Sequence, residues 1–225
     1  MLLDLHCHSK YSKDAVTSPK HIAEIAKQKG IVVALTDHNN ALSHKAYADA
    51  CKQLKIPFVL GQEQKVYWGN KFAGELLFYF LNEEIKSRGV LEAIDEARSQ
   101  GALVSVAHPF DPFRGLLNGK FKNIEKISGK VDAVEAFNSR CFTRAPNNAA
   151  KKFALKHSLG MTAGSDAHFP SEIGNALVEV PAASLEEARA LIAAGKVKIH
   201  GKVSGPLVHL ATWLARSGLL KKESD

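Results

Sequence analysis

The sequence predicts an α/β fold, a closed or nearly closed TIM-like barrel of strand–helix units with a site at the C-terminal ends of its strands. Short apolar runs alternate with longer amphipathic runs over 225 residues, and this alternation is typical of strands and helices in a parallel sheet. Nearly every apolar run also ends in a histidine or a carboxylate, and the strand ends of such a barrel share one face. An open doubly wound sheet is the alternative.

Strands are predicted, in chain order, at MLLDLH, IVVALTDH, PFVLGQE, ELLFYFL, ALVSVAH, VDAVEAFN, GMTAGSD and NALVEV. Helices are predicted at SPKHIAEIAKQKG, ALSHKAYADACKQLK, GVLEAIDEARSQG, APNNAAKKFALKHSLG and SLEEARALIAAG, and several begin with Ser or Pro and end before Gly. The late segment PLVHLATWLARSGLL is amphipathic at helical spacing. We expect one domain over residues 1–225, with a flexible tail from about residue 215 to 225.

His6 and His8 close the first predicted strand. Because side chains i and i+2 of a strand point the same way, the two imidazoles should converge while Cys7 points to the other face. Histidines commonly have only a local hydrogen-bond partner, but neutral imidazole is also the commonest protein ligand for transition metals. The pair therefore indicates a metal site only if other strand ends supply further ligands.

Other strand ends do supply them. With Asp14 counted, the candidate ligands are five imidazoles and three carboxylates: His6, His8, Asp14, His38, Glu63, His108, Asp166 and His168. Eight ligands exceed the four that a single tetrahedral zinc needs, so more than one metal is implied. The other five histidines lie in helix-like or late segments and are expected to be structural or surface groups: His21, His44, His157, His200 and His209.

The amino-acid composition indicates the charge of the binding partner and the cellular compartment. A formal net charge of +7 favours an anionic substrate or partner. No apolar run reaches the roughly 18 residues that span a bilayer, and we find no secretory signal, so no membrane association is expected. Cys7, Cys51 and Cys141 are odd in number and widely spaced, which favours a reducing compartment and a cytoplasmic location.

The segments DLHCHSKYSKDA, TDH, GQE, AHP and GSDAH resemble the ordered motifs of the PHP (polymerase and histidinol phosphatase) family over about residues 1–180. The resemblance implies a distorted (β/α)7 barrel, up to three divalent metals and phosphoesterase activity. It implies that His6, His8, Glu63 and Asp166 hold one metal, that Glu63 bridges to a second held by His108, and that Asp14, His38 and His168 hold a third.

One position departs from the family pattern. Where the family usually has a histidine in the strand after the GQE motif, this chain reads GELLFY and has Leu77. Leucine cannot bind a metal, so the second site is expected to have one ligand fewer. We therefore expect two or three divalent ions, and mixed imidazole and carboxylate ligands suit zinc, manganese or iron.

The cluster predicts hydrolysis of a phosphate ester of a small metabolite or nucleotide by metal-activated water. Two or three divalent ions outweigh the charge of three carboxylates, so the occupied site attracts an anion. Metals about 3.5–4 Å apart activate water and clamp phosphoryl oxygens. Arg140 and Arg114 follow predicted strand ends, where a guanidinium can hold two phosphate oxygens, although surface-loop arginines are equally common there.

Three other functions fit parts of the sequence. A nuclease would use the same metals with a basic groove for the polymer. An RNA- or DNA-binding protein related to the barrel subunit of ribonuclease P would explain the charge of +7, but it would not need eight ligands, and no aromatic-rich nucleic-acid motif is apparent. A zinc-dependent hydrolase of C–N bonds shares the paired histidines, but no candidate for the bridging lysine of that group is recognisable.

Overall fold

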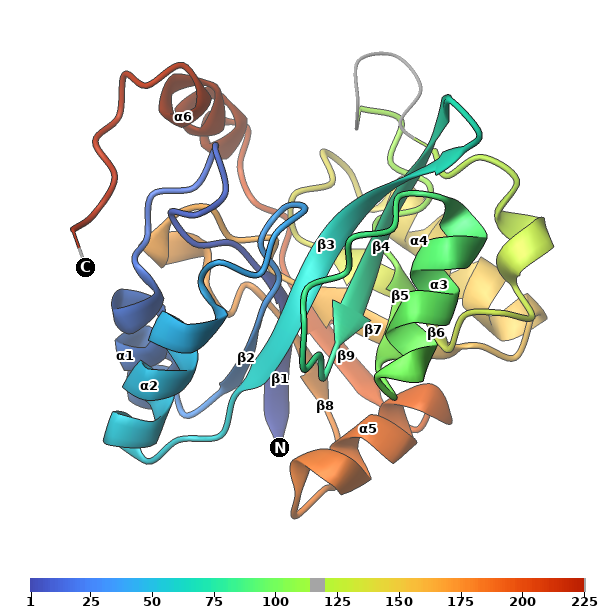
Figure 1. Cartoon of the computed structure of the whole chain (residues 1–225), viewed down its shortest axis with the longest axis horizontal. Helices are drawn as coiled ribbons and strands as arrows, with labels where there is room; N and C mark the ends of the chain where they lie inside the picture. The colour runs from blue at the N-terminus through green and yellow to red at the C-terminus, as the bar shows by residue number, and fades with distance from the viewer. Residues whose placement is uncertain (114–119, 225) are drawn as a thin grey trace.

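The computed structural model describes residues 1–113 and 120–224, which form a nearly closed, barrel-shaped sheet covered by helices (Figure 1). The strands of this described part lie in the order β7-β6-β5-β4-β3-β2-β1-β8-β9. Their bounds are β1 Leu2–Cys7, β2 Val32–Leu35, β3 Val59–Trp68, β4 Lys71–Tyr79, β5 Leu103–Val106, β6 Ala133–Asn138, β7 Gly160–Gly164, β8 Ala176–Glu179 and β9 Lys198–Gly201. This is the α/β barrel architecture that the sequence predicts.

The α-helices are α1 Pro19–Lys29, α2 His44–Leu54, α3 Val90–Ser99, α4 Ala145–Lys156, α5 Leu185–Ala193 and α6 Leu207–Arg216, with 3-10 turns at Ile124–Ile127 and Pro170–Glu172. In Figure 1, α1 and α2 lie on one side of the barrel and α3 and α4 on the other. The helix α5 lies at the end where β1 begins, and α6 lies at the opposite end, where β1 finishes. The C-terminal helix is thus placed over the predicted site.

The start and stop signals read from the sequence act as expected in α1. The Ser18 hydroxyl accepts a hydrogen bond from the His21 N–H at 3.2 Å, which caps the first turn. Pro19 occupies the first turn, where its missing N–H costs nothing. Gly30 ends the helix with φ of 62°, a left-handed conformation that glycine adopts without a steric penalty.

The barrel is distorted around β4. Pairs β1–β2, β2–β3, β5–β6 and β6–β7 are parallel, whereas β4 is antiparallel to both β3 and β5. The two residues between β3 and β4, Gly69 and Asn70, make a hairpin turn, and a turn of that length cannot form a crossover. The N-terminal half of β4 therefore lies at the same end of the barrel as the C-terminal ends of β3 and β5.

Hydrogen bonds between β1 and the segment after β7 close the sheet. The Asp166 N–H donates to the His6 carbonyl at 2.7 Å, and the His8 N–H donates to the Ala167 carbonyl at 2.9 Å. Gly164 permits this approach, because a Cβ at that position would lie 2.1 Å from the Cβ of His6. The closure brings together the two segments that carry the paired ligands.

A bulge in β1 sets which side chains face the barrel interior. The register against β2 shifts between Asp4 and Cys7, so β1 contains one extra residue there. Below the bulge, Leu3 and Leu5 pack in one apolar cluster with Leu77. Above it, Cys7 packs in the cluster that contains residues of α1, while the flanking histidines face the other way. The bulge thus stacks the histidine pair above the apolar interior.

Among the helices of the two described ranges, none has both the length and the apolar character needed to cross a bilayer.

We expect Gly164→Ala to destabilise the fold by about 1–3 kcal/mol, because the added methyl group forces β7 away from β1. Urea unfolding of the purified variant measures this loss. Gly129→Ala is the matched control, because a Cβ at Gly129 would meet no atom within 4 Å. Equal stability of both variants would contradict the tight β1–β7 closure.

Candidate metal centre

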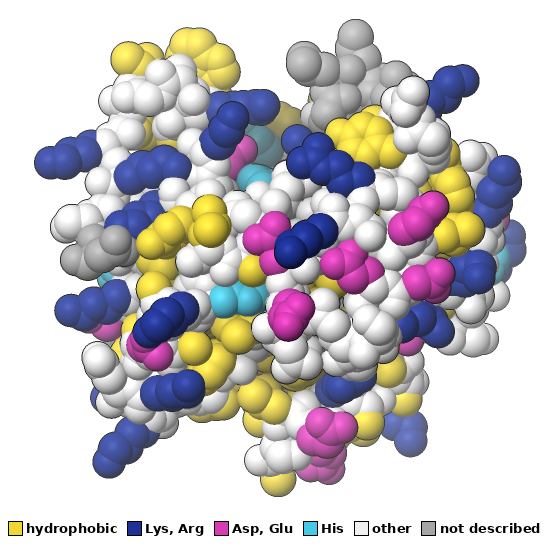
Figure 2. Space-filling view, in the orientation of Figure 1, with side chains coloured by type: hydrophobic (Ala, Val, Ile, Leu, Met, Phe, Trp, Pro, Cys, Tyr) yellow, Lys and Arg dark blue, Asp and Glu magenta, His cyan; other side chains and the backbone are white. Residues whose placement is uncertain are grey.

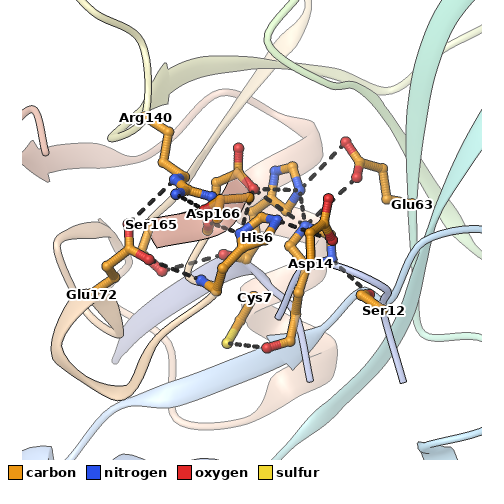
Figure 3. Close-up of polar contacts among 12 residues, drawn as sticks. His6, Cys7, Ser12, Asp14, Glu63, Arg140, Ser165, Asp166 and Glu172 are labelled. Atoms are coloured by element: carbon orange, nitrogen blue, oxygen red, sulfur yellow. Dashed lines mark hydrogen bonds and ion pairs between the residues drawn. The ribbon is translucent and has the colours of Figure 1, made fainter. Parts of the chain in front are cut away.

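Four predicted ligands lie together at the barrel mouth: His6 in β1, His8 directly after β1, Glu63 in the middle of β3 and Asp166 in the segment after β7 (Figure 3). The Nε2 atoms of His6 and His8 lie 3.0 Å apart. Asp166 Oδ1 lies 3.2 Å from His8 Nε2, and Glu63 Oε1 lies 3.4 Å from His6 Nε2. All four side chains are at most 1 % exposed. The convergence that strand alternation predicts for the two histidines is present.

The remaining four predicted ligands surround this group. His108 Nε2 lies 3.0 Å from Glu63 Oε1, and His38 Nδ1 lies 2.6 Å from Glu63 Oε2. Asp14 Oδ1 lies 3.4 Å from His38 Nε2 and 3.5 Å from His168 Nε2. All eight side chains predicted from the sequence therefore meet at one place, and Glu63 lies between the inner and outer groups.

The donor set fits divalent ions. His38 Nδ1 and Glu63 Oε2 are 2.6 Å apart and buried, yet neither forms a hydrogen bond with acceptable geometry, as expected for two atoms that point toward a shared cation. The 3.0 Å separation of the His6 and His8 nitrogens is near that of two ligands on one ion with metal–nitrogen distances of about 2.0–2.1 Å. Three sets have ligand atoms within 4.8 Å of one another: His6, His8 and Glu63; His8, His38 and His168; and His38, Glu63 and Glu75.

The electrostatics of the cluster favour the metal-binding forms of His8 and Glu63, whereas the carboxylates around His6 favour a positive charge at that position. Burial, and then the neighbouring His38, lower the pKa of His8 well below its usual value, so its imidazole is neutral. Burial alone would raise the pKa of Glu63, but His6 and His38 outweigh burial and lower that pKa well below its usual value. Burial alone would lower the pKa of His6, but Asp166 and Glu135 raise it well above its usual value. Ionised carboxylates around imidazoles are a negative environment that a cation stabilises.

Glu135, in the middle of β6, orients the imidazole of His6 and holds the backbone of His108. Its Oε1 lies 2.9 Å from His6 Nδ1, and its Oε2 accepts from the His108 N–H at 2.8 Å and from Asn138 Nδ2 at 3.1 Å. A carboxylate on the far nitrogen of a ligating imidazole fixes the tautomer and the ring orientation. Asn138 also donates to Asp166 Oδ2 at 3.2 Å, so one buried network positions both halves of the inner group.

Asp37 braces the loop that follows β1. Its carboxylate accepts from the Ser9 N–H and hydroxyl, from the Ser12 hydroxyl and from the Ser43 hydroxyl, at distances from 2.5 to 2.8 Å. The Ser12 hydroxyl in turn lies 3.4 Å from His8 Nδ1. Asp37 thus acts on a candidate ligand through Ser12 and not by direct contact.

Two candidate ligands have positive φ angles, 24° at His108 and 54° at Asp166. Such angles cost energy for residues other than glycine and persist where the surrounding structure imposes them. At Asp166 the hydrogen bond to the His6 carbonyl imposes the turn. The conformation aims the carboxylate back at the histidine pair.

Comparison with known proteins agrees with this geometry. The family model described as PHP domain matches residues 4–199, which includes all eight candidate ligands. The chain belongs to the PHP domain family. Two of the solved structures that share the fold are described as predicted or putative metal-dependent phosphoesterases. The resemblance found in the ordered motifs is therefore confirmed at the level of the family.

Two relatives come from Methanocaldococcus jannaschii. The uncharacterized protein MJ0417 is 35% identical over 190 residues, which cover 83% of this chain and 73% of that protein. The uncharacterized protein MJ1587 is 32% identical over 168 residues, which cover 69% of this chain and 92% of that protein.

Solved structures share the fold at low identity. A two-domain protein from Bacteroides vulgatus, described as containing a predicted PHP-like metal-dependent phosphoesterase, has a TM-score of 0.74 and 18% identity, covering 95% of this chain and 69% of that one. An amidohydrolase from Chromobacterium violaceum, solved with bound sulfate and without metal, has a TM-score of 0.63 and 17% identity, covering 80% of this chain and 92% of that one.

The PHP domain has one further candidate ligand, Glu75, that the sequence reasoning missed. Leu77 faces Glu63 across the β3–β4 ladder and is fully buried in the apolar interior, one pleat below the site. Glu75 lies two residues before Leu77 in β4. Because β4 runs antiparallel to its neighbours, Glu75 is nearer the barrel mouth than Leu77, and its Oε2 is 3.6 Å from His108 Nε2. The structure therefore offers a carboxylate where the sequence indicated a missing ligand.

Of the two arginines predicted to hold phosphate, Arg114 lies outside the described residues. Arg140 is 3 % exposed, and its Nε is 3.3 Å from Glu172 Oε1 (Figure 3). Its Nη2 donates to the Val208 carbonyl at 2.8 Å and to the Thr212 hydroxyl. Arg140 thus anchors α6 while it also lines the cavity described next. A contact with substrate phosphate stays a prediction.

A cavity of about 560 Å³ opens onto the outer ligands. Asp14, His38, His168 and Glu75 form part of its lining. Figure 2 shows a hollow in the molecular surface between α6 and the β3–β4 hairpin, with basic side chains around it. Its size is that of small-molecule sites, which span roughly 300–1,000 Å³.

The C-terminal tail of the chain fixes the loop that carries Asp14. Lys222 Nζ donates to the carbonyls of Lys10 and Ser12, both at 2.6 Å. The Glu223 N–H donates to the Val16 carbonyl at 2.9 Å, and the Glu223 carboxylate accepts from the Ser18 N–H at 2.8 Å. These contacts lie on both sides of Asp14 in the sequence, so residues far apart along the chain position one candidate ligand.

We expect Glu75→Gln to weaken binding of the ion nearest His108 by about tenfold or more. Loss of a direct ligand should lower metal affinity at least as much as loss of a residue that only orients a ligand, which typically lowers it about 10–100-fold. Calorimetric titration of metal into chelator-treated protein measures the change. Glu83→Gln, on an exposed residue outside the cluster, is the control. Unchanged titrations for both variants would exclude Glu75 from the ligand set.

We expect Lys222→Met to weaken binding of the ion nearest Asp14 by about tenfold or more, because the variant loses two charge-assisted hydrogen bonds, each worth roughly 1.5–3 kcal/mol. The same titration should show an unchanged tight site at the histidine pair. Lys221→Met, on the exposed neighbouring residue, should bind metal as the wild type does. If both lysine variants behaved alike, the tail would not position Asp14.

Proposed function

We propose that the chain is a metal-dependent phosphoesterase that hydrolyses a phosphate ester of a small metabolite or nucleotide with metal-activated water. The observation that carries this proposal is the convergence of eight candidate ligands at the mouth of the barrel, with the outer ones lining a cavity. The family assignment supports metal-dependent phosphoester chemistry in general terms.

The ligand set suits two or three divalent ions, with zinc, manganese and iron the candidates. His6, His8, Glu63 and Asp166 would hold one ion, Glu63 and His108 would hold a second, and Asp14, His38 and His168 would hold a third. Glu75 lies where it would complete the second set. When bound, such ions lower the pKa of water and neutralise charge that develops on phosphoryl oxygens.

The chain's own groups prepare the site for an anion. Glu135 and Asp37 fix the histidines and the Asp14 loop, so the ligand geometry is set before substrate arrives. The cavity lining adds Lys65, Arg140 and Arg216, which favour a negatively charged ester over a neutral one. Arg140 remains the proposed phosphate contact from the chain.

The other functions receive less support. Nucleic acid remains a possible partner, but the cavity has the size of a small-molecule site. For a hydrolase of C–N bonds with a bridging lysine, the described residues offer no buried lysine. We also propose a cytoplasmic location, because all three cysteines are buried and free, as a reducing compartment allows.

The test is metal content and hydrolysis measured on the same samples. Wild type purified without chelator should contain two or more ions per chain and hydrolyse a generic aryl phosphate. His8→Ala and Asp166→Ala should lose ions and at least about 100-fold of the activity, because bound metals supply several kcal/mol of transition-state stabilisation.

His200→Ala is the matched histidine control, since His200 is exposed on β9 and pairs with Glu179. It should keep both metal and activity. A wild type that retains metal but hydrolyses no phosphate ester would contradict the proposed function.

A further inference from the structure

The cavity has a second part whose walls are aromatic. Besides candidate ligands, its lining contains five rings: Tyr67, Phe72, Phe113, Phe142 and His209. Phe142 and His209 are stacked, with centroids 4.1 Å apart and an interplanar angle of 14°. Phe113 meets Phe142 edge to face, with centroids 4.9 Å apart. We call Phe113, Phe142 and His209 the aromatic wall.

The aromatic wall is open to solvent. Phe142 is 46% exposed and Phe113 is 67% exposed, although both are large apolar side chains. Exposed aromatic surface inside a concave site marks a place where a ligand contributes the missing contact. The partner of such a surface is apolar and planar, because rings prefer offset-stacked or edge-to-face neighbours.

Part of this wall comes from outside the matched PHP domain. The family match ends at residue 199, and α6 then supplies His209, Thr212 and Arg216 to the cavity. Hydrogen bonds from Arg140 to the Val208 carbonyl and the Thr212 hydroxyl hold α6 in place. The helix therefore adds a binding surface to the shared metal-binding barrel.

Two cations lie in the same cavity. The side chains of Lys65 and Arg216 line it, and neither has an ion-pair partner in the part of the chain that the structure describes. Candidate ligands, rings and both cations line this one cavity, together with Asp111, and Lys65 lies opposite Glu75 on the β3–β4 ladder. This arrangement suits a molecule that joins a phosphate to a planar ring system, and a polyol phosphate would leave the rings without a partner.

We propose that the substrate of this site is a mononucleotide whose base stacks on the aromatic wall while its phosphate monoester meets the metal centre. The assignment rests on the proposed function. In the reaction, a water oxygen bonds to phosphorus, the ester P–O bond breaks, and the leaving nucleoside oxygen takes a proton. The products are inorganic phosphate and a nucleoside, and the base is unchanged.

The test compares adenosine 5′-monophosphate with ribose 5-phosphate, which share the sugar and the phosphate and differ by the base. Metal-loaded wild type should have a KM at least about tenfold lower for the nucleotide, the effect expected of one base–aromatic stacking contact. Phe142→Leu should raise the KM for the nucleotide by about tenfold and leave that for ribose 5-phosphate within about twofold. Phe142→Tyr, which keeps the ring, should restore the wild-type value.

Trp213→Leu is the matched control, because Trp213 is an exposed aromatic residue of α6 outside the cavity lining. It should change neither KM. Binding of adenosine to the metal-loaded protein, measured by calorimetry, provides a readout that needs no hydrolysis and should also weaken in Phe142→Leu.

Equal KM values of the wild type for the two esters would overturn the nucleotide assignment, and so would an equal rise of both KM values in Phe142→Leu. Either result would leave the proposed phosphoesterase activity standing. A much lower KM for a single-stranded oligonucleotide than for the mononucleotide would overturn the nucleotide assignment in favour of a nuclease. If the generic aryl phosphate is hydrolysed but neither of these esters is, the nucleotide assignment fails alone, and if none of the three is hydrolysed, the proposed function fails. Adenosine binding that Phe142→Leu does not weaken would exclude the aromatic wall as a base site.

Discussion

The rest of the structure depends on the burial of a dense cluster of Lewis bases at the barrel mouth. Glu63 and Asp166 are essentially inaccessible to water and lie within 4 Å of imidazole nitrogens, with Asp14, Glu75 and Glu135 beside them. Buried carboxylates are costly unless paired or coordinated to cations. The histidines compensate this charge only when protonated, and His8 is held neutral. A divalent cation satisfies carboxylates and imidazoles together.

Most of this centre could be predicted from the sequence because a parallel barrel places its strand ends on one face. The eight candidate ligands each follow an apolar run or lie in the loop after the first one, so the topology alone brings them together. Glu75 could not be found in this way, since the direction of β4 decides which end of that strand faces the site. Gly69 and Asn70 between two apolar runs are the signal for a hairpin that would have indicated this.

The sequence was also silent about contacts made by its last residues. Lys222 and Glu223 belong to the segment predicted to be a flexible tail, and they form hydrogen bonds on both sides of Asp14. His209 was expected to be structural or a surface group, but it lines the cavity beside Phe142. These contacts join residues 67 and 212 positions apart in the sequence, and local patterns carry no information about such pairings. By contrast, His200 pairs with Glu179 at the surface, as a histidine outside the site should.

The most direct test of the central claim is anomalous X-ray diffraction from crystals of the metal-loaded protein, recorded on both sides of the absorption edge of the bound metal. The account predicts one anomalous peak among His6, His8 and Asp166 and at least one more on the other side of Glu63, with that carboxylate contacting both. A single peak distant from Glu63, or none at the barrel mouth in crystals that contain metal, would contradict a multinuclear centre built on this cluster.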